Sequence, residues 1–126
     1  MIIKKNESND SPFNIVLKED SDIDLIPKTG KYDHILIFIH DLFGNSSNFL
    51  EQFNKTDGPV SDNFKIIFPC APIAHVTRFN TNTTSWFDIT GKNLDPIYEE
   101  NIVFDDMDKN AERIKKLIKK RLNLNL

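Results

Sequence analysis

The feature that most constrains the fold is an apolar run that ends in a polar turn, HILIFIHDLFGNSSNFLEQF at residues 34–53. Residues 35–39, Ile-Leu-Ile-Phe-Ile, show no alternation of apolar and polar side chains. Such a run is typical of a parallel strand covered on both faces. After the turn, Asn45 or Ser46 can cap a helix whose inward residues are Phe49, Leu50 and Phe53. A strand, a sharp turn and a helix in this order predict an α/β fold.

The flanking segments extend this pattern. We expect a strand at 13–18, an acidic turn at 19–24 and a second buried strand at 64–68 that Pro69 and Pro72 end. Asp57-Gly58-Pro59 should break the first helix. Residues 71 to about 96 are expected to form a long loop. From Phe104 to Leu122, apolar residues recur every three or four positions, which predicts an amphipathic helix with acidic residues at its start and lysines at its end. Together these elements predict a mostly parallel sheet with flanking helices.

The composition fits one small domain. The chain has 126 residues and a net charge of −3, which argues against nucleic-acid binding. The lone cysteine, Cys70, cannot form an internal disulfide, and we find no secretory signal and no apolar run long enough to span a bilayer. We therefore expect a cytoplasmic protein with a flexible N-terminus at 1–12 and a single, partial domain at 13–126. No cluster of histidine and cysteine suggests a metal, and we expect no cofactor.

The turn at 40–48 admits three interpretations. A nucleophile at Ser46 or Ser47 fits poorly, because Asn48 stands where the G-x-S-x-G elbow needs a small residue and the only later histidine is His75. A helix cap is the simplest role for these serines. Backbone N–H groups at a helix N-terminus can also bind an anion. For His40, packing or a turn hydrogen bond is favoured over general-base chemistry, and neither His34 nor His75 has an acid or a nucleophile at a recognisable spacing.

Four segments together carry a resemblance. They are the strand and turn at 35–45 followed by Phe49, then Lys65-Ile-Ile-Phe-Pro-Cys-Ala-Pro72, Val76-Thr77 and Ser85-Trp-Phe-Asp-Ile89. This order resembles the acyl-protein thioesterases of the phospholipase/carboxylesterase branch of the α/β-hydrolases. Members run strand-H-G-L-G-D, a strand ending P-x-A-P, then V-T and S-W-F-D-I. The resemblance implies a serine hydrolase that cleaves acyl thioesters and carboxylic esters, including acyl chains on cysteine.

The resemblance also implies roles for particular residues. The backbone N–H of Leu42 would be an oxyanion donor, and Trp86 and Phe87 would lie on the acyl-binding side. Core packing is the alternative for Trp86. Asp88 is not the catalytic acid of the family, and a turn or strand hydrogen bond is its favoured role.

Two departures from the family pattern stand out. Asp41 occupies a family glycine position, while Phe43 and Gly44 replace glycine and aspartate. A carboxylate about 6 Å from an oxyanion would cost roughly 3 kcal/mol at an effective dielectric near 20, and less if it points to solvent. The larger departure is that the nucleophile strand and everything after it, with the acid and base, are missing before Leu126, so we expect an incomplete, inactive hydrolase.

Without the nucleophile strand, the strand at 35–39 would form an uncovered sheet edge. It carries none of the lysines, prolines or bulges that protect an edge, so self-association or pairing with a partner there is expected. The competing readings are a non-catalytic module that binds acyl chains or a partner through this edge, and a flavodoxin-like domain with an anion at Leu42. The last leaves Trp86-Phe-Asp-Ile89 unexplained.

Overall fold

The computed structural model describes residues 12–55 and 63–122, and the chain divides into two compact units, Met1–Cys70 and Ala71–Leu126. The expected break at Asp57-Gly58-Pro59 lies outside the described residues, as does almost all of the expected flexible N-terminus. The grouping of 13–126 into one partial domain stays a prediction.

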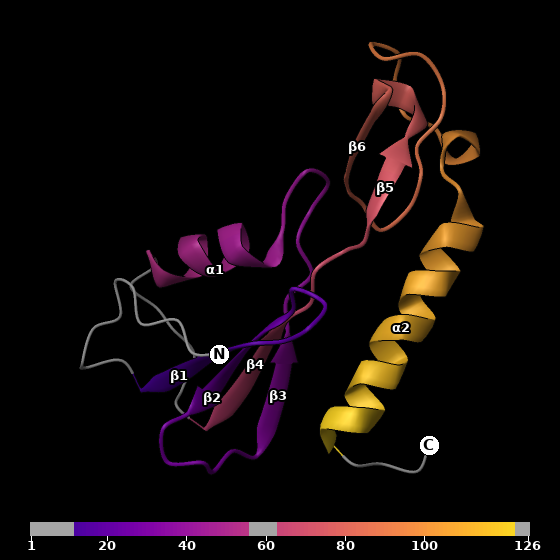
Figure 1. Cartoon of the computed structure of the whole chain (residues 1–126). Coiled ribbons are helices and arrows are strands. Elements are labelled where there is room, and N and C mark those ends of the chain that lie inside the picture. Colours follow the sequence, from indigo (N-terminus) through magenta and orange to yellow (C-terminus); the bar gives the residue numbers. More distant parts are fainter. Residues whose placement is uncertain (1–11, 56–62, 123–126) are drawn as a thin grey trace. The chain divides into compact units, whose positions relative to one another are not determined.

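The first unit is a four-stranded sheet with one helix (Figure 1). Its order is β1-β2-β4-β3, in which β2 pairs antiparallel with both β1 and β4, and β3 pairs parallel with β4. The elements are β1 (Phe13–Leu17), β2 (Ile23–Pro27), β3 (His34–Ile37), α1 (Ser46–Asn54) and β4 (Phe64–Phe68). The α/β class is confirmed, but in the described residues this sheet is mixed rather than mostly parallel.

One face of this sheet and α1 enclose the core of the first unit. Ile66 and Phe68 of β4 are fully buried, and Leu50 of α1 is 5% exposed against them. Phe49 and Phe53 flank Leu50, and both rings contact Phe68 at centroid distances of 5.7 Å. The three inward positions predicted for the helix are therefore confirmed.

The opposite face of the sheet carries a buried charge pair. The Asp24 carboxylate on β2 is completely buried, and the ammonium groups of Lys65 and Lys18 lie 3.8 and 3.9 Å from its Oδ2. The Lys65 ammonium also lies 5.6 Å from the ring centroid of Tyr32. Because a buried carboxylate is costly without a nearby cation, Lys65 makes a carboxylate tolerable within a central strand.

The second unit consists of a hairpin, two short turns of 3₁₀ helix and a long helix. The elements are β5 (Ile73–Val76), η1 (Thr77–Phe79), β6 (Thr81–Thr84), η2 (Glu99–Asn101) and α2 (Phe104–Leu122). β5 and β6 pair antiparallel from Ile73 opposite Thr84 to Val76 opposite Thr81. The helix predicted from Phe104 is confirmed, with Asp105 and Asp106 in its first turn. Among the described residues, no helix is long and apolar enough to cross a membrane.

Two expectations from the sequence were wrong. The acidic turn is shorter than 19–24, because Asp22 and Asp24 are buried and Asp24 belongs to β2. The expected long loop from 71 to 96 contains the β5–β6 hairpin, which turns at Asn80 in the left-handed conformation (φ +48°). The expected sheet edge at residues 35–39 is confirmed in part, because β3 is the terminal strand of the described sheet but ends at Ile37, and Ile39 is 49% exposed.

Candidate functional site

The turn after β3 is a four-residue β-turn from Asp41 to Gly44. The Gly44 N–H donates to the Asp41 carbonyl at 3.0 Å, and Phe43 has φ +66°. Type II turns require positive φ at this third position and favour glycine there. The structure therefore explains why the related family carries glycine where this chain carries Phe43, and it leaves Phe43 in a strained backbone conformation.

Leu42 occupies the second position of the turn. Within residues 12–55 and 63–122, its backbone N–H has no hydrogen-bond acceptor. The neighbouring Asp41 side chain is exposed, so water screens its charge. An uncommitted N–H beside a helix N-terminus has the chemistry of an oxyanion donor, which is the role that the resemblance implies for Leu42.

The polar residues around this turn have structural partners. Nδ1 of His40 is 2.8 Å from the Asp41 carbonyl, and the imidazole is 3% exposed. Asn45 is the N-cap of α1, since its side chain accepts from the Asn48 N–H at 2.8 Å. The Ser46 hydroxyl is buried and donates to the Ser21 carbonyl. The turn hydrogen bond predicted for His40 and the cap at Asn45 are confirmed, whereas the Ser46 hydroxyl holds the β1–β2 turn instead of capping the helix.

The other two histidines also have polar neighbours. His34 Nδ1 lies 2.6 Å from Asp33 Oδ1, and its ring stacks on Phe64. His34 therefore does have an acid beside it, the preceding residue Asp33, which the sequence analysis did not consider. His75 Nδ1 lies 3.1 Å from Asn82 Oδ1 across the hairpin. The described residues hold no group of three or more His, Cys, Asp or Glu side chains that could bind a metal ion.

Asp88 connects three segments of the second unit. Its carboxylate accepts from the Thr77 N–H at 2.7 Å and from the Thr77 hydroxyl at 2.6 Å. Its own N–H donates to Asp106 Oδ2, and its carbonyl accepts from the Val103 N–H. The hydrogen-bonding role predicted for Asp88 is confirmed.

These contacts set the charge of Asp88. Partial burial alone raises the pKa of the carboxyl group. The hydrogen bonds from Thr77 and Ile89 and the charge of His75 outweigh burial, so the pKa of Asp88 lies below its ordinary value. Asp88 is therefore ionised at neutral pH.

Arg78 was missed by the sequence analysis. Its side chain is 7% exposed, and its guanidinium donates to the carbonyls of Thr90, Asp95 and Pro96. Gly91 (φ +94°) packs so closely that a Cβ there would lie 2.8 Å from Nη2. Arg78 thus fixes the loop that follows Trp86 and Phe87, and no sequence motif marks it.

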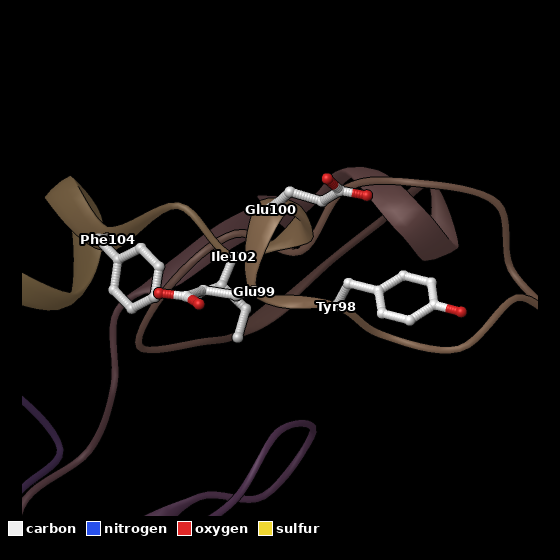
Figure 2. A pocket seen from close by; sticks show the side chains of 5 residues that line it. All are labelled: Tyr98, Glu99, Glu100, Ile102 and Phe104. Atoms are coloured by element: carbon white, nitrogen blue, oxygen red, sulfur yellow. The ribbon is translucent and has the colours of Figure 1, made fainter.

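The described residues of the second unit form at least two hollows. One, of about 230 Å³, is lined by Trp86, Phe87 and residues of β5 and α2. The other, of about 680 Å³, is lined by Tyr98, Glu99, Glu100, Ile102 and Phe104. Figure 2 shows the Tyr98 and Phe104 rings at opposite ends of this second hollow. Since Trp86 and Phe87 line the first hollow, only the first contains residues predicted to contact a substrate.

The strain at Phe43 can be measured with paired substitutions. Both Phe43→Gly and Phe43→Ala remove the ring, but only glycine relieves the positive φ. We expect Phe43→Gly to be more stable than Phe43→Ala by about 1 kcal/mol in urea unfolding followed by circular dichroism. At Gln52, an exposed position within α1, the same pair should rank in the opposite order, since alanine is the better helix former. Equal stability of the two Phe43 variants would contradict the strain.

The Thr77–Asp88 contact should make stability depend on pH. A carboxyl group whose pKa is lowered on folding stabilises the protein above its unfolded pKa of about 3.9, and this contribution is lost as pH falls through the folded pKa. We expect Asp88→Asn to lower the free energy of unfolding at pH 7 by about 1.5–3 kcal/mol. The difference from wild type should shrink below about pH 4.

Emission of Trp86, the only tryptophan, provides the measurement in denaturant titrations. Thr77→Val should reproduce part of the loss, because it removes only the hydroxyl donor. Asp108→Asn, an exposed change of the same type, is the control. If the deficit of Asp88→Asn is the same at low and neutral pH, the contact does not act through the ionised carboxylate.

Comparison with known proteins identifies the family. The family model for Phospholipase/Carboxylesterase matches residues 22–125. Among solved structures, the acyl-protein thioesterase 2 of Zea mays is similar, with a TM-score of 0.58 and 24% sequence identity over 76% of this chain. This chain spans 38% of the length of that thioesterase. The search of curated proteins gives no significant match. The chain belongs to the phospholipase/carboxylesterase family and has an α/β-hydrolase-type fold.

Proposed function

We propose that this chain supplies the oxyanion loop and an acyl-binding wall of a hydrolase that acts on acyl thioesters and carboxylic esters, and that these 126 residues alone have no turnover. The observation that carries the proposal is the Asp41–Gly44 turn, where the Leu42 N–H has no acceptor within the described residues. Trp86 and Phe87, which line a cavity in the second unit, would contact the acyl group.

The lack of turnover follows from the side chains that acyl transfer needs. An acyl-enzyme requires an activated nucleophile, which the family provides with G-x-S-x-G, and the 126 residues contain no such sequence. Ser46 cannot substitute for it, because its hydroxyl is buried and donates to a carbonyl. An oxyanion donor by itself stabilises an intermediate but cannot create one.

Incubation with a fluorophosphonate probe and with a thioester tests this proposal. We expect no stable labelling of Ser46 or Ser47 and no turnover once host esterases are removed. Ser46→Ala and Ser47→Ala variants provide the control for any residual signal. Turnover that persists in the pure protein and disappears in either variant would show that a serine of this turn is the nucleophile.

The alternative is a non-catalytic module that binds a partner or a second copy through the sheet edge. It is favoured by one observation, the terminal position of β3, whose residues Ile35 to Ile37 are only partly buried. A parallel edge of apolar residues offers unpaired backbone groups for strand addition.

Light scattering over a range of protein concentrations tests the edge. Association through β3 should decrease in Ile37→Lys, because a lysine at the edge opposes strand pairing while its stem stays on the apolar surface. Ile73→Lys, on the separate hairpin, provides the matched control, and circular dichroism checks folding. A monomer at all concentrations, or equal association of both variants, would leave this alternative without support.

A further inference from the structure

The C-terminal half of α2 carries positive charge that the described residues do not neutralise. Residues 113–122 contain no aspartate or glutamate and six basic residues, which are Arg113, Lys115, Lys116, Lys119, Lys120 and Arg121. Lys115, Lys116 and Lys120 are exposed. Within residues 12–55 and 63–122, none of these three lysines has a carboxylate partner.

Four of the basic residues share one side of the helix. At 3.6 residues per turn, Lys115, Lys116, Lys119 and Lys120 fall within an arc of about 140°. We call these four lysines the basic face. Ile114 and Ile118 project from the other side of the helix and are half-buried. The basic face is therefore the more exposed side of this part of α2.

The helix dipole explains only part of this charge. A base stabilises the C-terminus of a helix through the dipole only within about the last turn. Lys119, Lys120 and Arg121 lie in that turn, whereas Lys115 and Lys116 come before it. Glu112 has the i,i+4 spacing to Lys116, but the described structure has no ion pair between them. Helix stability therefore does not account for Lys115 and Lys116.

The acidic residues at the start of α2 do not cancel the basic face. Asp105 and Asp106 lie in the first turn, about 20 Å along the helix from Lys119 at a rise of 1.5 Å per residue. The Debye length at physiological ionic strength is about 8 Å. An anionic surface at the C-terminal end of α2 is therefore attracted by the lysines and hardly repelled by these aspartates.

The residue types favour a lipid surface over nucleic acid or a single bound anion. Arginine forms fixed, bidentate contacts with one phosphate or carboxylate, whereas a lysine ammonium acts as a mobile point charge. A membrane with many anionic headgroups can attract all four ammonium groups without matching their positions. Single-stranded nucleic acid is bound by bases interleaved with aromatic side chains, and residues 113–122 contain no aromatic residue.

We propose that the basic face of α2 binds the surface of a membrane that contains anionic phospholipids, with the C-terminal end of the helix nearest the lipid. The contact is electrostatic and reversible. It involves neither the Leu42 turn nor Trp86, so it is independent of the proposed function.

Sedimentation of the full chain with lipid vesicles tests the proposal. The two preparations are phosphatidylcholine alone and phosphatidylcholine with phosphatidylserine at about two to one. We expect binding to the anionic vesicles to be tighter by about tenfold or more. Raising the salt from about 0.05 to 0.5 M should weaken that binding by a similar factor, because salt screens the lysines.

Paired charge substitutions test the location. A lysine near an anionic surface contributes about fivefold in affinity, so the double variant Lys116→Gln, Lys120→Gln should bind about 10- to 30-fold more weakly. Lys28→Gln with Lys31→Gln removes the same charge at exposed positions of the first unit, and should change binding by less than about threefold. Replacing Lys116 and Lys120 with arginine keeps the charge and should keep binding.

The lipid and salt series in the unmodified protein decides the proposal even if a variant fails to fold, which circular dichroism checks. Equal binding to both kinds of vesicle would overturn it, because the contact would then be apolar. Equal affinity for polyglutamate or for an RNA oligonucleotide at the same salt would assign the face to an acidic protein or to nucleic acid. Competition by soluble glycerophosphoserine would indicate a site for one headgroup instead of a surface. Equal loss in the two lysine-to-glutamine variants would also contradict a contact through α2.

Discussion

The second unit depends on the hydrogen bonds of Asp88. This residue joins η1, through Thr77, to the start of α2, through Asp106 and Val103. These hydrogen bonds matter because the unit buries little apolar surface. Among its described hydrophobic residues only Ala71, Val76 and Ile89 are buried, and no residue of α2 is. With so small a core, hydrogen bonds to an ionised group, each worth about 1.5–3 kcal/mol, become a large part of the stability.

The first unit is stabilised by a different balance of forces. The seven buried residues of its main apolar cluster lie on one side of the sheet or on α1, and four phenylalanine rings, at positions 38, 49, 53 and 68, pack together there. This packing fixes β3 and α1 and therefore the turn between them. The Leu42 N–H owes its position to hydrophobic packing, whereas Trp86 and Phe87 owe theirs to polar contacts.

The sequence predicted the elements whose signal is local. β3, β4, α1 and α2 each have a long apolar run or a helical period, and Asn45 is a recognisable cap. The sequence did not predict β2, because Asp24 in a five-residue strand resembles a turn. The ammonium groups that compensate for its burial belong to Lys18 and to the distant Lys65. The sequence did not predict the β5–β6 hairpin, because Thr81–Thr84 has no alternation of apolar and polar residues. Arg78 could not be found at all, since its partners are backbone carbonyls 12 to 18 residues away.

The departures from the family pattern in the turn are partly compensatory. By the resemblance, the family places glycine at position 41 and aspartate at position 44, whereas this chain has Asp41 and Gly44. The structure shows that the two corners share one space, because a Cβ at Gly44 would lie 2.7 Å from Asp41 Oδ1 and 3.1 Å from the Asp41 carbonyl. In this chain the Asp41 side chain occupies the space beside Gly44, and the exchange keeps one carboxylate in the turn. No such exchange relieves Phe43, which keeps its Cβ at positive φ. The backbone strain of this turn therefore lies at Phe43. The turn from Asp41 to Gly44 still forms with the exchanged residues at positions 41 and 44 and with phenylalanine at position 43.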